Sequence, residues 1–398
     1  MRIGLVTTSY PRFPGDPAGG FVAEHAAYLT RAGHDVEVIA AGGASARDAA
    51  AGSIQVRWVP APRGLFDGAG APEALAGGGR MHLAAARFSL ALAREVGRRA
   101  PTWDAAVAHW LVPSALAALV AARRLPLLAI AHSGDVHLLR RLRAIRAMAA
   151  LCSRGGVQLS FVTEELRRLF LERAPGCAGH SQVCPMGIDL ARLRAARLPA
   201  DGHRAGPADR GAVASAAPAT VLFLGRLVPV KGVDVLVRAA ARWRCGARLV
   251  IAGAGPLEPT LRGLAARTAP GRVTFAGQIL GPDRDRALAG ADLVALPSIR
   301  VEGGRSEGLP LVALEAMAAG AAVVASSVGG LAELPAAAVT RVVPGDADAL
   351  AAAIDGLLLD PARRTAQTTA QDRLIISFDW AAVGPRLLPP PPVARSAP

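Results

Sequence analysis

The amino-acid sequence predicts an α/β fold made of two doubly wound, Rossmann-like domains. Strands and helices alternate along both halves of the chain, which is the pattern of a parallel sheet covered by helices. Between the halves, residues 195–218 lose hydrophobic periodicity and become rich in Ala, Gly, Asp, Arg and Pro. A chain of 398 residues is long enough to bury two cores. Two such sheets joined by a linker imply a cleft between the domains.

The expected domain boundaries follow from these shifts in composition. We place an N-terminal domain at 1–187, a linker at 188–219, a C-terminal domain at 220–375, and a return segment with a disordered Pro-rich tail at 376–398. Domains of this length lie within the usual range for α/β proteins.

The N-terminal domain is expected to open with a βαβ unit. Strand 2–7 enters a loop rich in Pro and Gly that ends at Gly19 and Gly20, and helix 21–32 follows. Paired glycines let a ligand approach the backbone closely, so both are candidates for a ligand-binding loop; a flexible turn is an equal alternative. The loop lacks the GxGxxG pattern, which disfavours dinucleotide binding of the usual kind.

The same alternation continues up to the linker. The expected elements are strands 35–40, 54–59, 105–108, 127–131 and 159–162, and helices 80–98, 113–123, 136–151 and 163–171. His132 follows strand 127–131, at the carboxyl end where α/β sheets bind ligands. His132 is therefore a candidate catalytic residue; the alternative is a structural residue that only forms hydrogen bonds. Asp135 is expected to cap the next helix.

The predicted helix 136–151 carries a cluster of positive charge. Its arginines stand among Leu, Ile and Met; they are Arg140, Arg141, Arg143 and Arg146. This pattern fits a basic amphipathic surface that docks on anionic lipid. It fits equally well a helix that buries its apolar face in the core and exposes its charged face.

The C-terminal domain is expected to contain six strands. They are strands 221–225, 249–252, 273–275, 293–296, 322–326 and 340–343, with helices 233–242, 258–266, 284–289, 310–319 and 347–358 and a short helix around Leu331. Asp283-Arg284-Asp285 spells DxD, which could hold a metal bound to a nucleotide diphosphate. Because it follows Pro282 at a predicted helix start, a role as helix-capping charge is favoured.

Residues 306–320 carry the strongest functional signal. Glu307 precedes the helix predicted at 310–319, and Glu315 lies within it. The first backbone N–H groups and the positive end of the helix dipole form a site for an anion, most naturally a phosphate. A phosphate with two carboxylates beside it suggests a sugar nucleotide, whose hydroxyls the carboxylates bind. A solvated loop glutamate beside an ordinary helix glutamate is the alternative.

The basic charge of the chain is carried almost entirely by arginine. Of the 45 basic residues only Lys231 is a lysine, which suggests a position that needs a compact point charge. Lys231 and Arg226 lie in the segment GRLVPVKG, on the loop that leaves strand 221–225. In this topology the loop faces the same rim as the start of helix 310–319, where two cations would neutralise a diphosphate.

Composition also bears on partners and compartment. The net charge of +14 suits a nucleic-acid binder, but aromatic residues make up only 4% of the chain, too few for a base-stacking platform. The four cysteines show no CxxC pair and no zinc-like spacing, which favours a reduced, cytoplasmic compartment. We expect neither a signal peptide nor a membrane span.

These motifs resemble those of the family 4 retaining glycosyltransferases with the GT-B fold. In the C-terminal half the resemblance rests on GRLVPVKG, residues 253–256, residues 273–277, Pro297-Ser298 and, above all, EGLPLVALE at 307–315. In the N-terminal half it rests on SYPRFPGDPAGG, AHWLVPSA, AHSGD and PMGID. It covers nearly the whole chain, although the linker looks expanded and the end looks short for the helix that returns to the first domain in this fold.

The resemblance implies a role for each candidate residue. Arg226 and Lys231 would contact the donor diphosphate, Glu315 the nucleotide ribose, and Glu307 the transferred sugar, together with the backbone of Gly308, Leu309, Pro310 and Leu311. His132 would lie near the sugar and the leaving phosphate, and Gly19 and Gly20 near the phosphate or the acceptor. Catalysis is assigned to Arg226, Lys231, Glu307 and His132.

The implied reaction is transfer of a sugar from a nucleotide-diphosphate sugar, such as a UDP- or GDP-sugar, to a hydroxyl acceptor with retention of configuration. No metal or other cofactor is expected, because cations and the helix dipole take its place. The acceptor is expected to be a sugar or a lipid-linked sugar in cell-envelope polysaccharide or glycolipid synthesis, at the inner membrane face. A same-fold nucleotide-sugar hydrolase or epimerase, or a protein that binds nucleic acid or anions without catalysis, is the alternative.

Overall fold

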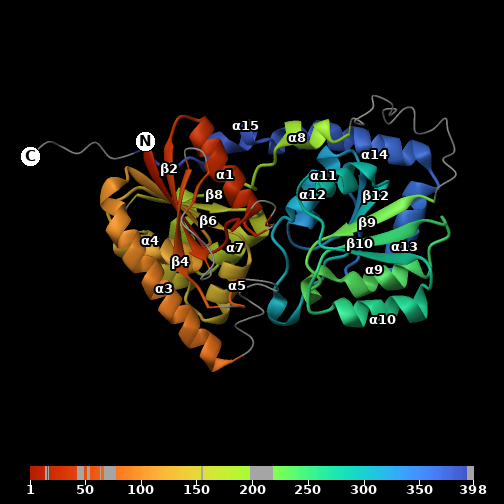
Figure 1. The fold of residues 1–398 in the computed structure, drawn as a ribbon, viewed down its shortest axis with the longest axis horizontal. Coiled ribbons are helices and arrows are strands. Elements are labelled where there is room, and N and C mark those ends of the chain that lie inside the picture. Colours follow the sequence, from red (N-terminus) through yellow and green to blue (C-terminus); the bar gives the residue numbers. More distant parts are fainter. Residues whose placement is uncertain are drawn as a thin grey trace, which may run out of the picture. The chain divides into compact units, whose positions relative to one another are not determined.

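The computed structural model describes residues 1–13, 16, 18–42, 49–51, 54–62, 64–66, 78–153, 156–197 and 218–391. The chain forms two compact units (Figure 1). The N-terminal unit comprises Met1–Gly187 and Trp380–Pro398, and the C-terminal unit comprises Ile188–Asp379. Residues 198–217 of the predicted linker and 392–398 of the predicted Pro-rich tail lie outside the described residues.

The described part of the N-terminal unit contains a sheet of eight strands in the order β3-β4-β2-β1-β5-β6-β7-β8. The strands are β1 Arg2–Thr7, β2 Asp35–Gly42, β3 Ala49–Ala51, β4 Ile54–Pro60, β5 Ala105–His109, β6 Leu127–Ala131, β7 Val157–Phe161 and β8 Ser181–Val183. All neighbours are parallel except β3 and β4. Because β1 lies between β2 and β5, the strand order reverses beside β1.

Helices connect these strands. The helices are α1 Gly20–Arg31, α3 Gly79–Arg99, α4 Leu116–Ala121, α5 Gly134–Arg141, α6 Ile145–Cys152, α7 Glu164–Leu171 and α15 Trp380–Val383, with shorter turns η1 Ala100–Thr102, η2 Leu111–Ala115, η3 Pro175–His180 and η9 Gly384–Leu387. Thr163 caps α7 by accepting the Leu166 N–H. The short strands β3 and β8 have no counterpart in the sequence prediction, because three residues carry too little periodicity to be recognised.

The single helix predicted at 136–151 is wrong. The structure has two helices there, α5 and α6, separated by Leu142, Arg143 and Ala144. Arg143 adopts a left-handed φ of 55°, and the Ala144 N–H bonds to the Leu139 carbonyl, as at the end of many helices. Periodicity alone did not reveal this break, because such left-handed helix ends usually carry glycine.

The C-terminal unit is built on a parallel six-stranded sheet in its described part, in the order β11-β10-β9-β12-β13-β14. The strands are β9 Thr220–Leu224, β10 Arg248–Ala252, β11 Val273–Gly277, β12 Leu293–Leu296, β13 Ala322–Ser326 and β14 Thr340–Val342. The six predicted strands are therefore confirmed. The order reverses between β9 and β12, so the carboxyl ends of these two strands form a switch point, where such sheets bind ligands.

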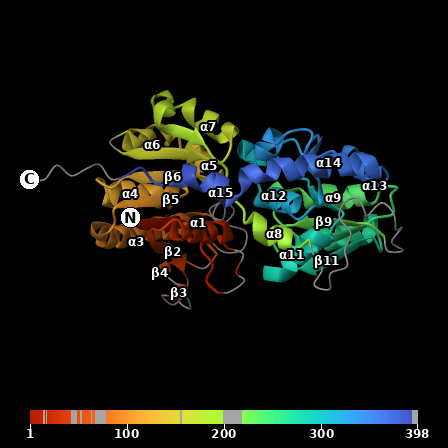
Figure 2. The ribbon, with the colours of Figure 1, turned by 90° about the horizontal axis from the view of Figure 1, so that it is seen from above.

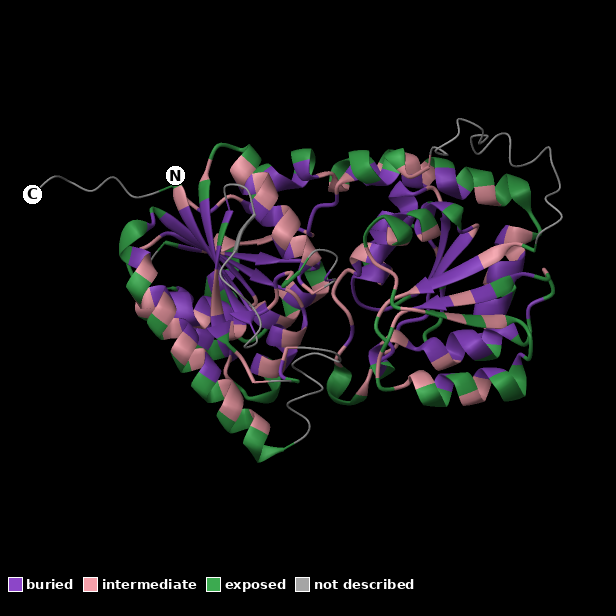
Figure 3. Cartoon of the chain, in the orientation of Figure 1, coloured by how far each residue is buried: buried purple, intermediate pink, exposed green. Residues whose placement is uncertain are grey.

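Both faces of this sheet are buried. The helices are α8 Leu190–Ala195, α9 Val233–Ala240, α10 Glu258–Thr268, α11 Gly281–Gly290, α12 Leu311–Ala318, α13 Ala347–Leu358 and α14 Pro361–Leu374, with turns η5 Pro229–Lys231, η6 Glu302–Gly304, η7 Gly329–Glu333 and η8 Ile375–Phe378. Helices α9, α10 and α13 cover one face, while α8, α11 and α12 cover the other (Figure 1). The central strands β12 and β13 are therefore buried throughout (Figure 3), whereas the edge strand β11 has no buried residue.

Residues 188–197 lie inside the range predicted as linker, but they form α8 and its flanks. Leu193 is fully buried against α12, and the Arg197 guanidinium donates to the carbonyls of Met317 and Ala318 at the end of α12. The short helix was missed because its apolar residues look sparse beside the polar sequence that follows.

The end of the chain belongs to the N-terminal unit. From the sequence, the end of the chain looked too short to return to the first domain. In the structure, α14 is followed by a segment from Trp380 that belongs to the N-terminal unit. The Trp380 ring stacks against His25 and Tyr28 of α1, and α15 lies beside α1 (Figure 2). A side chain at Gly384 would overlap the Tyr28 ring, which shows how closely this segment packs.

Candidate active site

Lys231 and Glu307 meet at the switch point of the C-terminal unit. Lys231 ends η5 on the loop after β9, and Glu307 lies on the loop after β12, so the two strands beside the switch point supply one residue each. The Lys231 Nζ lies 2.5 Å from the Glu307 Oε1. Their side chains are only 12% and 14% exposed, which strengthens the ion pair relative to one at the surface. The prediction that these loops share a rim is confirmed by this contact.

A second group orients Glu307. Ser298, which follows β12 and is buried, donates its hydroxyl to the Glu307 Oε2. Each carboxylate oxygen therefore has its own partner, and the carboxylate plane is held in one orientation. The sequence marked Ser298 as part of the family resemblance but assigned it no role.

Glycines let the loops around this pair approach one another backbone to backbone. A Cβ on Gly253 would lie 1.8 Å from the Gly225 carbonyl oxygen, and one on Gly329 would lie 2.1 Å from the Glu307 carbonyl oxygen. Gly232, with a left-handed φ of 59°, closes η5 directly after Lys231. The position of the ammonium thus depends on backbone contacts that a larger residue would not allow.

The helix predicted at 310–319 begins one residue later than expected. Pro310 has an extended ψ of 120° and precedes the first helical residue, Leu311. Gly308 is held by the Gly330 N–H, which donates to its carbonyl. Leu309 and Leu311 are half-buried, and Pro310 is buried. The first N–H groups of α12 therefore lie a few residues from Glu307, as the predicted anion site requires.

Glu315 is buried on α12 and forms a two-pronged ion pair with Arg284 of α11. One guanidinium nitrogen donates to Oε1 at 2.9 Å, and the other donates to Oε2. Sequence reasoning missed Arg284, because 31 residues separate it from Glu315 and no spacing rule connects two different helices. A carboxylate held in this way keeps lone pairs for hydroxyl groups.

The DxD pattern around Arg284 does not gather its carboxylates at one point. Asp283 pairs with Arg286 on the exposed side of α11, whereas Asp285 is buried and binds Arg192 of α8. Asp283 lies in the first turn of α11, as a capping charge would. Among the described residues, no cluster of three or more His, Cys, Asp or Glu side chains has the arrangement of a metal site.

Arg226 lies on the same loop as Lys231, but its side chain is exposed. This placement puts a second cation on the loop after β9, and the exposure gives the side chain room to change its direction.

In the N-terminal unit, Gly19 and Gly20 follow β1 beside the reversal of strand order. Gly19 has a left-handed φ of 68°, and a Cβ there would lie 2.2 Å from the Ser9 carbonyl oxygen. Gly20 is the first residue of α1, and a Cβ there would meet no atom within 4 Å. The backbone thus requires glycine at Gly19 but not at Gly20, where the open space faces the start of a helix.

His132 is the end of a row of three histidines. The His132 Nε2 lies 3.0 Å from the His109 Nδ1, and the His109 Nε2 lies 3.0 Å from the His25 Nδ1. The His25 Nε2 lies 3.1 Å from the Leu387 carbonyl oxygen of the C-terminal segment. His25 and His109 are fully buried. The sequence singled out His132 but missed the other two, which come from α1 and β5.

Burial keeps the three rings, which we call the histidine chain, neutral near pH 7. It lowers the pKa of His25 to about 4 and the pKa of His132 to about 3, and the neighbouring His25 lowers the latter further. The pKa of His109 is lowered well below its ordinary value, first by burial and then by the other two histidines. The histidine chain is therefore a neutral hydrogen-bonding system rather than a positive patch.

The backbone around His132 is held in unusual conformations. Trp110 after β5 has a φ of 70°, and Ser133 after β6 has a φ of 121°. The buried Asp135 carboxylate accepts the N–H groups of Leu111, His132, Ser133 and Val136, which ties the ends of both strands together. Asp135 was expected to cap this helix, but it lies within the first turn of α5, whose N-cap residue is Ser133. Strain retained at the carboxyl ends of strands is typical of functional sites.

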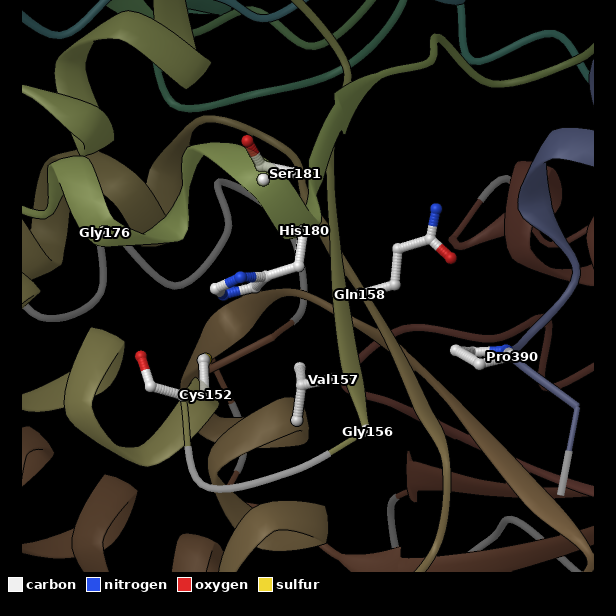
Figure 4. A pocket seen from close by; sticks show the side chains of 10 residues that line it. Cys152, Gly156, Val157, Gln158, Gly176, His180, Ser181 and Pro390 are labelled. Carbon is white, nitrogen blue, oxygen red and sulfur yellow. The ribbon is translucent and has the colours of Figure 1, made fainter. Parts of the chain in front are cut away.

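A hollow of about 700 Å³ lies elsewhere in the N-terminal unit (Figure 4). It is lined by Gly156, Val157 and Gln158 at the start of β7, by Ser181 at the start of β8, and by Cys152 and His180. These are the amino ends of the strands, whereas His132 follows a carboxyl end. The hollow is therefore on the opposite edge of the sheet from the candidate residues.

The predicted lipid-binding arginines are all exposed. Arg140 and Arg141 end α5, Arg143 lies between the two helices, and Arg146 lies in α6. Leu142, which also lies between the helices, is 62% exposed. None of the described helices has both the length and the apolar character that crossing a bilayer requires.

Two family profiles match the chain, one for each unit. The family described as "Glycosyltransferase Family 4" matches residues 18–192, and the one described as "Glycosyl transferases group 1" matches residues 218–360. Among curated proteins, the chain is 31% identical over 408 residues to a glycogen synthase of Mycobacterium tuberculosis, with 96% of this chain and 92% of that protein covered.

Another relative is matched over a shorter length. The chain is 33% identical over 240 residues to a GDP-mannose-dependent monoacylated alpha-(1-6)-phosphatidylinositol monomannoside mannosyltransferase of Corynebacterium glutamicum. This match covers 58% of the chain and 60% of that protein. By its printed name, this relative is a mannosyltransferase that depends on GDP-mannose.

Solved structures show the same fold. Sucrose-phosphate synthase from Thermosynechococcus elongatus superimposes with a TM-score of 0.74 at 22% identity, covering 97% of each chain. Anabaena HepE in complex with UDP-glucose superimposes with a TM-score of 0.66 at 21% identity, covering 96% of this chain and 98% of that one. Two parallel sheets with their switch points, the two family profiles and the near full-length relative agree, and the chain belongs to the family 4 glycosyltransferases with the GT-B fold.

Proposed function

We propose that the protein transfers a sugar from a nucleotide-diphosphate sugar to a hydroxyl group of an acceptor, with retention of configuration. The observation that carries the proposal is the contact between Lys231 and Glu307 at the switch point, beside the start of α12. It places a cation, a carboxylate and a set of helix N–H groups within one small region, and these are the groups that a sugar diphosphate needs.

The diphosphate is bound by positive charge from three sources. An ammonium has three N–H donors, so Lys231 can bind Glu307 and a phosphate oxygen at the same time. The start of α12 adds backbone N–H groups and the positive end of the helix dipole. Arg226 adds a guanidinium from the same loop as Lys231. As the bond between the sugar and the phosphate breaks, negative charge grows on the leaving phosphate, and these groups stabilise it.

The two carboxylates bind hydroxyl groups. Glu315 accepts from the ribose of the nucleotide while Arg284 holds its carboxylate in place. Glu307 accepts from the transferred sugar while Ser298 and Lys231 hold its plane. A carboxylate has about four lone-pair positions, so each can serve a protein partner and a sugar hydroxyl together.

In this reaction the acceptor hydroxyl attacks the anomeric carbon as the bond to phosphate breaks. The acceptor proton passes to an oxygen of the leaving phosphate, and the new bond forms on the face from which the phosphate leaves, which retains the configuration. The protein therefore contributes positioning and charge stabilisation, with no protein nucleophile. We propose that turnover does not need a metal ion, because Lys231, Arg226 and α12 supply the positive charge.

Relatives support the choice of donors to test. One matched mannosyltransferase is GDP-mannose-dependent by its printed name, and the fold neighbour HepE was solved with UDP-glucose. We propose a UDP- or GDP-sugar as donor and a sugar or lipid-linked sugar of the cell envelope as acceptor.

Thermal stabilisation tests the donor. The protein is titrated with UDP, GDP, UDP-glucose and GDP-mannose, and a ligand that binds the native state raises the melting temperature. We expect stabilisation by the nucleotides of one base, weakened by Glu315→Ala. Absence of any shift with all four compounds would contradict the proposal. Free sugar released without dependence on an acceptor would instead identify a hydrolase.

We further propose that the exposed arginines Arg140, Arg141, Arg143 and Arg146 hold the enzyme at an anionic membrane surface, where a lipid-linked acceptor is found. Charge reversal at Arg140 and Arg141 should weaken sedimentation with vesicles that contain anionic lipid, and it should leave binding to neutral vesicles unchanged. Equal binding by both proteins would contradict the membrane role without affecting the proposed reaction.

A further inference from the structure

The histidine chain has a direction that the structure determines. A carbonyl oxygen only accepts hydrogen bonds, so the His25 Nε2 must carry the proton that it donates to Leu387. In a neutral imidazole only one nitrogen is protonated, so the His25 Nδ1 accepts. Its partner, the His109 Nε2, must then donate.

The same argument passes along the row to His132. With its Nε2 protonated, neutral His109 has a bare Nδ1, which accepts from the His132 Nε2. The His132 Nδ1 is consequently bare as well. The carbonyl of Leu387 thus sets the tautomer of His132 through the two hydrogen-bonded rings that lie between them.

We infer that His25 and His109 are positioning residues that hold His132 as a hydrogen-bond acceptor, so that its Nδ1 receives a substrate hydroxyl and does not donate to a phosphate oxygen. The inference rests on the proposed function and gives His132 a place in it. A bare ring nitrogen repels a phosphate oxygen, since both carry lone pairs, but it accepts the O–H of a sugar.

Aromatic packing keeps the row in place. The Trp380 ring stacks on His25 with centroids 5.3 Å apart, and the His109 and His132 rings stack with centroids 5.2 Å apart. Phe21 and Trp110 contact His132 at 5.1 and 4.9 Å between centroids. These contacts restrict rotation of the rings, so the order of donors and acceptors persists.

Neutrality of all three rings is the condition for this order. A protonated ring would donate from both nitrogens and reverse one of the bonds. Burial disfavours the protonated form of each ring; His25 and His132 disfavour it further at His109, and His25 does so at His132, whereas the bond to Leu387 favours it at His25. The carboxylate near His132, that of Asp135, is occupied by four backbone N–H groups.

The direct test needs no substrate. Long-range ¹H–¹⁵N correlation spectra of the whole protein, labelled at histidine and recorded near pH 7, distinguish the two neutral tautomers. We expect Nε2 to be protonated and Nδ1 bare in all three rings, assigned by single His→Phe substitutions. A protonated Nδ1 on His132 overturns the inference, whatever the protein proves to bind.

A substitution tests the anchoring. His25→Phe keeps an aromatic ring against Trp380 but removes both hydrogen bonds, so His132 should show a mixture of tautomers. His82→Phe, at an exposed histidine of α3, is the matched control and should leave the His132 signals unchanged. An unchanged His132 tautomer in folded His25→Phe, as judged by circular dichroism, overturns the role of His25.

Binding measurements test the partner of His132. His132→Phe should weaken binding of UDP-glucose or GDP-mannose, whichever binds the wild-type protein, by about tenfold, the cost of one lost hydrogen bond. It should leave binding of UDP or GDP unchanged. An equal loss for the nucleoside diphosphate overturns the inference. If no sugar nucleotide binds the wild-type protein, the proposed function fails while the spectra still decide the tautomer.

Discussion

The candidate residues of the two units use opposite electrostatic solutions. In the C-terminal unit, Lys231 with Glu307 and Arg284 with Glu315 are ion pairs in partly buried surroundings. In the N-terminal unit, the histidine chain is neutral, two of its three rings are fully buried, and its bonds run from ring to ring to a backbone carbonyl. An ion pair holds its members by charge, whereas the neutral rings are held by burial and by the order of their hydrogen bonds. The two groups should therefore respond differently to substitution and to acid.

Removal of the single lysine should have the largest effect. Lys231→Ala should lower kcat roughly 10² to 10³-fold, because the growing charge on the leaving phosphate loses a fixed cation. Steady-state kinetics with the donor found by thermal stabilisation measure this.

Lys231→Arg is the matched variant, since it keeps the charge but puts a larger planar group beside Glu307, in a place where the Lys231 side chain is only 12% exposed. We expect it to lose activity as well. Full activity of Lys231→Ala would contradict the proposed role of the ion-paired lysine in catalysis.

The ion pair on α11 and α12 should matter for stability. Arg284→Ala leaves the Glu315 carboxylate, whose side chain is 10% exposed, without its two-pronged partner, and should cost about 3 kcal/mol of unfolding free energy. Chemical denaturation measures this. The double variant Arg284→Ala/Glu315→Gln should recover part of the loss, because it removes the uncompensated charge. A single variant as stable as the wild-type protein would show that the pair is dispensable.

Acid should destabilise the protein through the histidine chain. In the unfolded chain histidine takes up a proton near pH 6.5, but in the folded protein burial lowers the pKa of His25 to about 4 and that of His132 to about 3. Stability from these rings is therefore complete above pH 6.5 and is lost as pH falls toward 4, by up to about 1.4 kcal/mol per pH unit for each ring.

Melting temperatures between pH 7 and 4.5 test this. His25→Phe should give a shallower decline than the wild-type protein, whereas His82→Phe should not. Parallel declines in all three proteins would mean that the acid sensitivity comes from other groups.

Gly19 and Gly20 should differ in how well they tolerate a side chain, and this is the smallest of the expected effects. Gly19→Ala forces a side chain into a left-handed conformation against the Ser9 carbonyl and should cost about 2 kcal/mol. Gly20→Ala meets no neighbouring atom and should leave the melting temperature unchanged or slightly raised. Reduced turnover in a stable Gly20→Ala protein would indicate a ligand at the start of α1, and unchanged turnover would argue against one.

Local signals identified the framework well. The strands of the C-terminal unit are continuous apolar runs bounded by glycine and polar residues, and the predicted bounds agree with the structure to within about two residues, as such boundaries usually do. The loop residues Lys231 and Glu307 followed from the same pattern, because a parallel sheet gathers the carboxyl ends of its strands at one edge. The short helix α8 and the break at Arg143 were missed, since neither carries a strong turn or period signal.

By itself, the sequence determined two α/β sheets, the loops that leave their strands, and a helix start with one carboxylate before it and another within the helix. Periodicity and turn chemistry are local, so they can be read along the chain. Only the tertiary structure decided that Arg284 holds Glu315, and that His25, His109 and the Leu387 carbonyl set the state of His132. These contacts join residues 23 to 362 positions apart, and packing brings them together without leaving a spacing in the sequence.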